Sequence, residues 1–374
     1  MSTEVNHERF MARALQLAKR GLYTTDPNPR VGCVVVKDGQ IVAEGWHQTA
    51  GAGHAEVEAL KAAGESAKGA TVYVTLEPCS HTGKTPPCAD QLIRAGIVEV
   101  VCAMQDPNPL VSGRGFERLR QAGIPVVNAV LEQQARELNP GFIKRMELGL
   151  PLVRCKLAMS LDGRTAMASG ESQWITGPAA RSDVQRLRAR SSAIITGVGT
   201  AVLDNPSLNL RSDELGLKNA LEVVQRQPLR VLLDSRFRIP ATAKLLDQTQ
   251  DVLVIGAEHN ASGGLLAEQG IETLVLANEQ GQVDLKAVLK ELAQRECNEV
   301  LLEAGATLSG AFLQLGLVDE LVLYVAPKLL GGDARSLFNL PGLQSMSDQI
   351  KIEIKDVRNV GEDLRINAIV AATS

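Results

Sequence analysis

The sequence predicts an α/β protein of two domains. Its 374 residues exceed the number that one hydrophobic core usually organises, so two domains of roughly 150 to 220 residues are expected. Short segments rich in Val, Ile and Leu alternate with segments of helical periodicity, which is typical of three-layer α/β domains. Hydrophobic residues make up 45% of the chain and charged residues 22%, as in ordinary globular proteins. We expect the domains at 1–147 and 148–374.

The first domain is expected to begin with an amphipathic helix, a hairpin and a second helix. Asp38-Gly39 is a turn signal between two apolar runs and predicts the hairpin over 30–45. The helix that follows at 54–63 should end at Gly64. The later segments predict a buried strand at 71–78, a helix at 88–96, a strand at 99–107, a helix at 115–123, a short strand at 125–130 and a connecting helix at 132–147.

The second domain is expected to form another α/β series. Strands are predicted at 152–159, 193–198, 230–235, 251–256, 272–277, 299–303 and 320–326, and helices at 178–190, 284–295 and 307–316. The last segments alternate polar and apolar residues around Gly361, which predicts an antiparallel hairpin at the end of the sheet.

Composition argues against several classes of function. With a net charge of −4 and 3% aromatic residues, the chain offers neither a basic surface nor stacking groups for general nucleic-acid binding. We expect no membrane span and no signal peptide, because no sufficiently long apolar run is present. The thinly spread cysteines favour reduced thiols and a cytoplasmic protein. Three of them lie in strand patterns and are expected to fill the core: Cys33, Cys102 and Cys155.

Four residues of the first domain have the pattern of a catalytic zinc site. Catalytic zinc takes three protein ligands and keeps one position open for water. His54 and Glu56 lie at an expected helix start, Cys79 follows a strand, and Cys88 opens a helix whose dipole favours a thiolate. Residues two apart on a helix point about 200° away from each other, so His54 and Glu56 can share a site only if His54 caps the helix.

This pattern matches the signature of zinc nucleobase deaminases. Glu56 is not needed as a ligand, so it could take a proton from the activated water and pass it to a leaving amine. Each residue alone could be an ordinary surface histidine or a buried structural cysteine. A purely structural zinc would need a fourth protein ligand, for which His81 is the nearby candidate.

The second domain shows signs of a nucleotide site without a Rossmann fingerprint. The stretch AIITGVGT, at 193–200, suggests a strand and a glycine turn but lacks the third glycine. The stretch LLEAGATLSGAFL, at 301–313, combines a strand, a tight turn and a helix start that could cradle a pyrophosphate. Ser235 and Arg236 end a strand and could accept a ribose 2′-phosphate. Each could be an ordinary turn, but together they indicate a nucleotide cofactor.

Cationic side chains would supply further chemistry in the second domain. Lys156 leaves a strand toward the expected site, and Arg211 lies in a loop where it could hold a phosphate. Lys156 is expected to orient or protonate a substrate oxygen, with a structural ion pair as the alternative. Other arginines lie on and around one helix, and some of them should face only water: Arg181, Arg186, Arg188 and Arg190.

The combined motifs resemble the bifunctional riboflavin-biosynthesis deaminase/reductase family. The matching stretches of the first half are PNPRVGCVVV, GWH, HAEVEAL, TLEPCSHTGKTPPC and DPNP. Those of the second half are KLAMSLDGRTA, SQWITG, GVGTAVLDNPSLNLR and LLEAGATLSGAFL. They run in the family's order from about residue 8 to about residue 332, and their combination is far more specific than any one of them.

The resemblance implies a cytidine-deaminase-like first domain and a dihydrofolate-reductase-like second domain. The first would hydrolyse the 2-amino group of 2,5-diamino-6-(5-phosphoribosylamino)pyrimidin-4(3H)-one. The second would use NADPH to reduce the ribosyl side chain of 5-amino-6-(5-phosphoribosylamino)uracil to ribityl. The partners would be these small phosphoribosyl-pyrimidines, and we expect a homo-oligomer, either a dimer or a tetramer.

The resemblance also implies the site residues. Zinc would be held by His54, Cys79 and Cys88, with Glu56 as the proton shuttle. The cofactor NADPH would contact Ala158, Trp174, Thr200, Asp204, Ser235, Gly305, Ala306, Thr307, Leu308, Ser309, Gly310 and Ala311. The reductase substrate would contact Ser172, Arg188, Leu208, Arg211 and Glu303, and Lys156 would orient or protonate its sugar oxygen.

The spacing of the two ligand cysteines is unusually wide. Eight residues, Ser80–Pro87, separate them, where the short deaminase signature has two. We expect this segment to form an additional wall beside the metal. Its polar residues are predicted to read the ribose phosphate together with other residues of the domain: His81 and Lys84, helped by Asn28, His47, Asp106 and Asn108.

Two rival interpretations follow from the same residues. One is a deaminase of free cytidine or of a tRNA base with an unrelated C-terminal domain, although the low aromatic content argues against the tRNA form. The other is a zinc-stapled binding module without turnover. The module predicts a closed four-ligand metal site and no effect of replacing Glu56 by Ala, whereas a deaminase should lose ammonia release.

Overall fold

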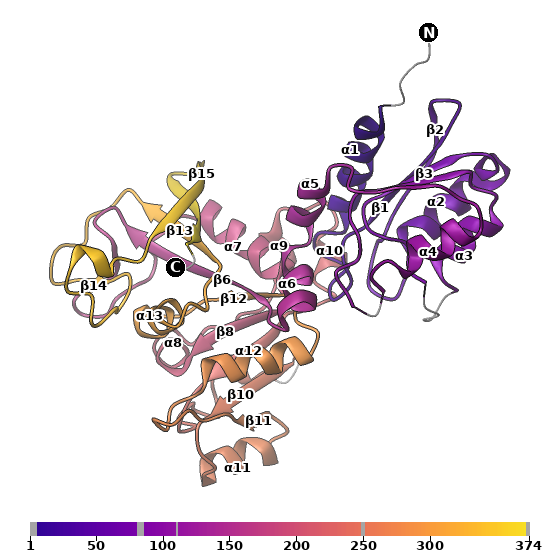
Figure 1. Cartoon of the computed structure of the whole chain (residues 1–374). Helices are drawn as coiled ribbons and strands as arrows, with labels where there is room; N and C mark the ends of the chain where they lie inside the picture. Colours follow the sequence, from indigo (N-terminus) through magenta and orange to yellow (C-terminus); the bar gives the residue numbers. More distant parts are fainter. Residues whose placement is uncertain (1–5, 81–85, 110, 248–250, 372–374) are drawn as a thin grey trace. The chain divides into compact units, whose positions relative to one another are not determined.

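The structure, a computed structural model, describes residues 6–80, 86–109, 111–247 and 251–371 (Figure 1). The chain divides into two compact units, Met1–Gly149 and Leu150–Ser374. Each unit has its own central sheet and its own hydrophobic cores. Within the described ranges, no helix combines the length and apolar character needed to cross a membrane.

The first unit is built on a five-stranded sheet in the order β2-β1-β3-β4-β5. Strand β1 pairs antiparallel with β2 and β3, and β3, β4 and β5 are parallel. The strands are β1 (Gly32–Lys37), β2 (Gln40–Trp46), β3 (Thr71–Val74), β4 (Glu99–Cys102) and β5 (Val126–Val127). The helices are α1 (His7–Ala18), α2 (Ala55–Ala63), α3 (Cys88–Arg94), α4 (Arg114–Gln121), α5 (Glu132–Leu138) and α6 (Pro140–Leu148), with the 3₁₀ turns η1 (Lys19–Gly21) and η2 (Gly64–Ala67).

Helices cover both faces of this sheet. Successive side chains of a strand point to opposite faces. In β1, Cys33 and Val35 accordingly pack in a core with α2, α3 and α4, whereas Val34 and Val36 pack in a second core with α1, α5 and α6. The three-layer arrangement predicted from the sequence is therefore confirmed.

The predicted hairpin and helix end are also present. Asp38 and Gly39 have φ values of 50° and 73°, the left-handed conformation that tight hairpin turns require. Gly64 follows α2 with a φ of 52°. One prediction was wrong, because the helix expected at 132–147 is two helices, α5 and α6.

Asn139 separates these two helices. The residue before a proline is disfavoured in the helical conformation, and Asn139, which precedes Pro140, has φ −126° and ψ 43°. Its side chain accepts from the Arg30 N–H at 2.8 Å and donates to the Arg30 carbonyl at 2.9 Å. The break therefore places Asn139 where it ties the connecting segment to the start of the sheet.

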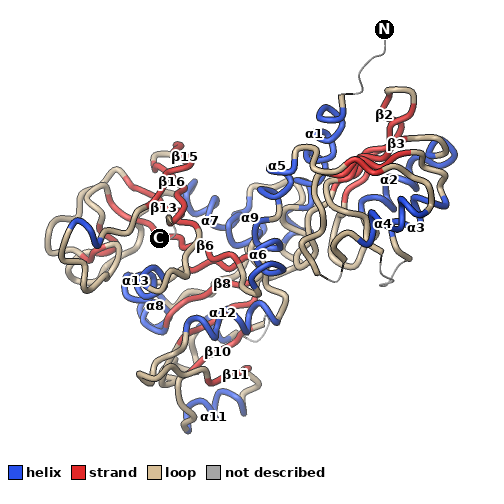
Figure 2. The backbone as a smooth tube through the Cα atoms, viewed as in Figure 1, coloured by secondary structure: helices blue, strands red, loops and turns tan. Residues whose placement is uncertain are grey.

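The second unit is built on a nine-stranded sheet in the order β11-β10-β9-β8-β12-β6-β13-β16-β15. Figure 2 shows strands of this sheet in red, with helices beside them in blue. The pairs from β11 to β13 are parallel, and β16 and β15 add antiparallel strands at one edge. The strands are β6 (Leu152–Ser160), β8 (Ala193–Gly197), β9 (Leu229–Leu233), β10 (Val252–Gly256), β11 (Glu272–Val275), β12 (Glu299–Leu302), β13 (Glu320–Ala326), β15 (Ile352–Val360) and β16 (Asp363–Val370). A separate small ladder joins β7 (Arg164–Ala166) to β14 (Arg335–Ser336).

Helices cover both faces of this sheet as well. Helices α12 and α13 share one core with the strands, and α7, α8 and α11 share the other. The helices are α7 (Pro178–Arg190), α8 (Val198–Asp204), α9 (Ser212–Leu215), α10 (Ala220–Val223), α11 (Ala261–Glu268), α12 (Leu285–Gln294) and α13 (Ala306–Gln314), with the 3₁₀ turns η3 (Lys244–Leu246) and η4 (Met346–Asp348). The sequence did not predict α8 to α11, β7 or β14. These elements are short, and glycines weaken the helical pattern of α8 and α11.

Candidate functional site

The three predicted zinc ligands lie together in the first unit. Their ligand atoms are all within 4.8 Å of one another. His54 Nδ1 lies 3.2 Å from Cys88 Sγ and 3.6 Å from Cys79 Sγ. In a tetrahedral zinc site, such nitrogen and sulfur ligands are about 3.6 Å apart. The donor set and its spacing therefore fit a zinc ion with a fourth position for water.

The starts of two helices, α2 and α3, position two of these ligands. His54 is the N-cap of α2, with φ −68° and ψ 162°. It therefore lies just outside the helix, as expected if His54 and Glu56, two positions apart, share one site. Cys88 is the first residue of α3. The Cys88 N–H donates to Cys79 Sγ at 3.3 Å, and the Ala89 N–H donates to the Cys79 carbonyl at 3.2 Å. The start of α3 is thus bonded to the segment that follows β3.

The two sulfur atoms form an anionic pair that suits a cation. A hydrogen bond from the Cys88 thiol, aided by His54, lowers the pKa of Cys79 to about 4 despite its burial. The same bond raises the pKa of Cys88. A divalent ion would bind both sulfurs in their deprotonated form, because zinc binds cysteine as thiolate.

Glu56 is the predicted proton shuttle and lies in the first turn of α2 with 3% of its surface exposed. Burial raises the pKa of Glu56 to about 7; the charge of His54 opposes this rise and that of Cys79 adds to it. Glu56 is outside the ligand cluster found among the described residues. A carboxyl group with such a pKa can both accept and return a proton near neutral pH.

Asn28 and His47 connect to the ligand His54. The Asn28 amide nitrogen lies 3.1 Å from His47 Nε2, and His47 Nδ1 lies 3.0 Å from the Gly53 carbonyl. The rings of His47 and His54 meet edge to face, with centroids 5.7 Å apart. Burial lowers the pKa of His47, which favours a neutral ring that donates to Gly53 and accepts from Asn28.

The other predicted deaminase substrate residues are only partly described. Asp106 and Asn108 belong to the loop between β4 and α4, where the Asn108 N–H donates to Asp106 Oδ1 at 2.8 Å. His81 and Lys84 lie outside the described residues. Contacts of these four side chains with a substrate therefore stay predictions.

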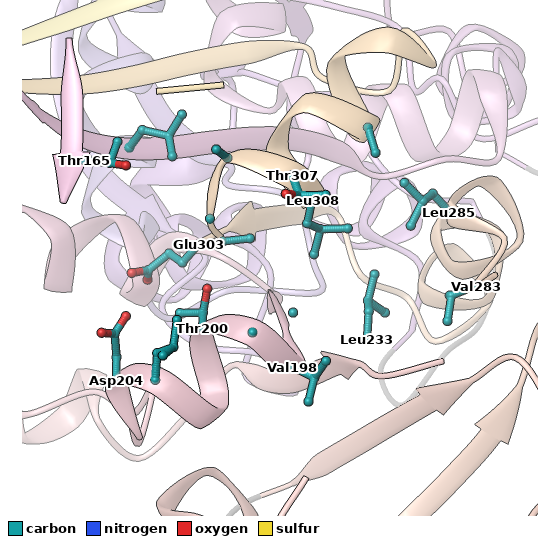
Figure 3. A pocket seen from close by; sticks show the side chains of 18 of the residues that line it. Thr165, Val198, Thr200, Asp204, Leu233, Val283, Leu285, Glu303, Thr307 and Leu308 are labelled. Carbon is teal, nitrogen blue, oxygen red and sulfur yellow. The ribbon is translucent and has the colours of Figure 1, made fainter. Parts of the chain in front are cut away.

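A second site is a cavity of about 1250 Å³ in the second unit (Figure 3). Drug-sized ligands fill cavities of roughly 300 to 1,000 Å³, so this one has room for a substrate beside a cofactor. It lies at the carboxyl ends of parallel strands, where α/β sheets bind ligands. Fourteen predicted residues line it: Lys156, Ala158, Ser172, Arg188, Thr200, Asp204, Leu208, Ser235, Glu303, Gly305, Ala306, Thr307, Leu308 and Ala311.

A buried ion pair lies at the polar part of the cavity. Arg188 donates from Nε and a terminal nitrogen to both oxygens of Glu303, at 2.6 and 3.0 Å. Burial alone would raise the pKa of Glu303, but Arg188 and Lys156 hold it below its ordinary value. Lys156 Nζ lies 3.9 Å from Glu303, beyond hydrogen-bond distance, and burial lowers the pKa of Lys156 although Glu303 opposes this.

Several predicted residues do not line the cavity: Trp174, Arg211, Arg236, Ser309 and Gly310. The Trp174 ring is stacked with Arg181, and Arg211 pairs with Glu214 at 3.0 Å. Ser309 is fully buried and donates to the Ala304 carbonyl. A Cβ on Gly310 would meet the Asn339 carbonyl oxygen at 2.0 Å, so that glycine permits close packing of α13.

The cavity also contains residues that the sequence did not predict. Leu233, Val283 and Leu285 gather on one side, away from Glu303 and Asp204 (Figure 3). Polar residues of the segment before and at the start of α12 border the cavity as well: Asn278, Gln280, Gln282, Asp284 and Lys286. The sequence carried a signal for this segment, because Asp284 marks a helix start after a strand. No pattern in the sequence indicated that this segment would border a ligand site.

Comparisons with known proteins match both units of the chain. The family described as "RibD C-terminal domain" matches residues 151–366, and the "Cytidine and deoxycytidylate deaminase zinc-binding region" matches residues 4–104. The chain is 50% identical to the riboflavin biosynthesis protein RibD of Escherichia coli K12, over 97% of this chain and 99% of that one. It is 51% identical to the Haemophilus influenzae RibD, over 96% and 95%.

Solved structures show the same fold. Acinetobacter baumannii RibD is 50% identical and superimposes with a TM-score of 0.90, covering 98% of this chain and 99% of that one. A Thermotoga maritima diaminohydroxyphosphoribosylaminopyrimidine deaminase/5-amino-6-(5-phosphoribosylamino)uracil reductase is 35% identical, with a TM-score of 0.84 over 98% and 99%. The deaminase-like first unit and the dihydrofolate-reductase-like second unit predicted from the sequence are confirmed. The chain belongs to the RibD family of bifunctional riboflavin-biosynthesis deaminase/reductases.

Proposed function

We propose that the chain catalyses two successive reactions of riboflavin biosynthesis, one in each unit. The first would hydrolyse the 2-amino group of 2,5-diamino-6-(5-phosphoribosylamino)pyrimidin-4(3H)-one and release ammonia. The second would reduce the ribosyl side chain of the resulting 5-amino-6-(5-phosphoribosylamino)uracil to ribityl. The observation that carries this proposal is that each unit contains its own polar site, a metal-ligand cluster beside Glu56 in one and the Glu303 cavity in the other.

In the deaminase, Glu56 would move the protons. Zinc held by His54, Cys79 and Cys88 would supply a water acidified toward neutrality. The Glu56 carboxylate would accept a proton from that water as its oxygen adds to the amidine-like carbon of the pyrimidine. Glu56 would return the proton to the amino group as the C–N bond breaks. With a pKa of about 7, its carboxyl group can both accept and release a proton near neutral pH. Asn28 and His47 would orient the substrate.

In the reductase, Lys156 would act as the proton donor. NADPH would supply a hydride to C1′ of the ribosylamine. The sugar ring opens as the bond between C1′ and the ring oxygen breaks, and the Lys156 ammonium would give that oxygen its proton. Arg188 binds both Glu303 oxygens, so Lys156 is not the main partner of Glu303. This geometry favours the catalytic role of Lys156 over the structural ion pair.

The shape of the cavity suggests how NADPH would lie in it. Gly305 is the N-cap of α13, and the first turn of that helix faces the cavity, so its free N–H groups could bind the pyrophosphate. The apolar side formed by Leu233, Val283 and Leu285 suits the adenine (Figure 3). Lys286 borders that side and could bind the 2′-phosphate together with Ser235.

Two separate signals test this proposal. The purified protein should be incubated with the diaminopyrimidine ribotide, with and without NADPH, while ammonia and NADPH oxidation are followed independently. Ammonia should appear without NADPH, and NADPH should be consumed only with the deaminated product. Consumption of cytidine with neither signal from the ribotide would contradict the assignment.

We further propose a homo-oligomer, a dimer or a tetramer. Strand β15 forms one edge of the nine-stranded sheet and bears exposed apolar side chains, among them Ile352, Ile354 and Val357. An exposed apolar edge strand is a ready template for pairing with another chain. Light scattering on the purified protein should give a mass of two or four chains. We also propose a cytoplasmic location, which is supported by the six cysteines, none of which forms a disulfide in the described residues.

A further inference from the structure

Glu77 is a buried carboxylate that the chemistry above does not use. It lies two residues before the ligand Cys79, and 3% of its surface is exposed. Each of its oxygens accepts two backbone hydrogen bonds. Oε2 accepts from Asp106 at 3.2 Å and Gly113 at 2.9 Å, and Oε1 accepts from Gly115 at 2.8 Å and Phe116 at 3.3 Å.

These bonds cap helix α4 from a distant part of the chain. The N-cap of α4 is Gly113, with a φ of 78° and no side chain to accept from the first turn. The first N–H groups of a helix have no partner within the helix, and a negative charge is favourable beside them. Glu77 therefore supplies the cap that Gly113 cannot.

The start of α4 also packs closely against the segment that carries the ligand Cys79. A Cβ on Gly115 would lie 2.0 Å from the Pro78 carbonyl oxygen, so only glycine allows this approach. The Glu77 N–H also donates to the Met104 carbonyl at 3.0 Å. Glu77 thus bonds to both ends of the loop between β4 and α4, while its neighbour Pro78 leads directly to Cys79.

We infer that Glu77 is a positioning residue for the deaminase substrate. It fixes the backbone of Asp106, and the Asp106 side chain in turn accepts from the Asn108 N–H at 2.8 Å. The loop that carries these two residues is thereby locked to the segment that carries Cys79. This inference rests on the proposed function, because it assumes that the loop contacts the substrate.

The replacement Glu77→Gln tests this role in the zinc-loaded full chain. An amide has one acceptor oxygen, and its NH₂ group would face N–H donors, so two of the four bonds cannot form. We expect KM for the diaminopyrimidine ribotide to rise about tenfold with a smaller change in kcat, because the substrate contacts shift. Zinc content and reductase activity should be unchanged. Glu117→Gln is the matched control, since Glu117 is exposed on α4 and its side chain accepts a hydrogen bond from Gln121 on the same helix.

A double-mutant cycle separates positioning from general stability. If Glu77 acts through the loop, adding Glu77→Gln to Asn108→Ala should raise KM no further than Asn108→Ala alone. Independent, multiplying effects on KM would overturn the inference, as would loss of zinc from Glu77→Gln or an unchanged KM. If Asn108→Ala alone leaves KM unchanged, the proposed substrate role of the loop fails instead.

A second variant reaches the same loop without changing Glu77. Gly115→Ala should push the start of α4 away from Pro78 and raise KM in the same manner, with zinc retained. This variant decides the question if Glu77→Gln does not fold. A normal KM in Gly115→Ala would overturn the inference in that case.

Discussion

The two sites of this protein are constructed in different ways. The metal-ligand cluster brings together one residue from the start of α2, one from the start of α3 and one from the segment after β3, with their ligand atoms within 4.8 Å of one another. The reductase cavity is lined by residues of many strands, helices and loops, most of them apolar or small. The first site is thus a compact chemical centre whose function depends on a few groups. The second is a large cavity in which most individual contacts should contribute little to ligand binding.

Charge is also handled differently in the two sites. Cys79 and Cys88 would both bind a divalent cation as thiolates, and the hydrogen bond from Cys88 already lowers the pKa of Cys79. In the cavity, Glu303 is already neutralised by Arg188, and Lys156 adds a further positive charge. The first site thus requires a metal to complete it, whereas the second carries its own charged groups. We therefore expect sharp, complete losses of activity at the first site and graded losses at the second.

Removing zinc should have the largest effect. A chelator that strips the metal should abolish ammonia release, because zinc would acidify the attacking water. NADPH oxidation with the deaminated uracil ribotide should continue, because the reductase cavity lies in the other unit. Zinc added back should restore ammonia release. Equal loss of both activities would show that the two sites are not independent.

The replacement Glu56→Gln should come next. The amide cannot take up a proton, so the rate of ammonia release should fall by about 10²–10⁴-fold. Metal analysis should still find zinc, since Glu56 is not a ligand. The binding-module interpretation predicts no change in the protein's behaviour, so a variant of wild-type rate would favour it.

The replacement Lys156→Met should lower the reductase kcat by about 10²-fold and leave ammonia release intact. The wild-type enzyme should also lose reductase activity as pH rises through the lysine pKa, because only the ammonium can donate. Burial lowers the pKa of Lys156, so this loss should come below the pH at which an ordinary lysine titrates. An unchanged kcat in the variant would return Lys156 to a structural role.

The smallest effect should come from Lys286→Ala. Lys286 is exposed at the edge of the cavity, so its contact with the 2′-phosphate is screened by solvent, and KM for NADPH should rise only about threefold. KM for NADH, which lacks this phosphate, should not change. Lys290→Ala, an exposed lysine one turn further along α12, is the control. Equal effects of Lys286→Ala on both cofactors would place the 2′-phosphate elsewhere.

The difference between the compact metal-ligand cluster and the large cavity also explains which features could be predicted from the sequence. The cluster of His54, Cys79 and Cys88 could be predicted because zinc chemistry demands particular residue types near helix starts and strand ends, and its three ligand atoms do lie together. The role of Glu56 as a proton shuttle stays a prediction. The long strands and helices were predictable because their periodicity is strong. The Asn139-Pro140 pair was a local signal for the break between α5 and α6, but the bonds that hold Asn139 depend on a distant partner, Arg30.

Other features depend on tertiary contacts that have no local signal. Val283 and Leu285 look like ordinary core residues, and only the packing of α12 brings them to the cavity. Glu77 lies within a recognisable motif, yet its role depends on the close approach of Gly115. Trp174 was expected from the resemblance, and Arg211 both from its place in a loop and from the resemblance; the structure pairs them with other protein groups.

The independence of the two sites is most directly tested by NADPH oxidation in the Glu56→Gln variant. The variant should be given the diaminopyrimidine ribotide in one experiment and the deaminated uracil ribotide in another. We predict almost no oxidation with the first substrate and a wild-type rate with the second. A wild-type rate with the first substrate, or loss of activity with both, would contradict an account in which each unit performs its own step.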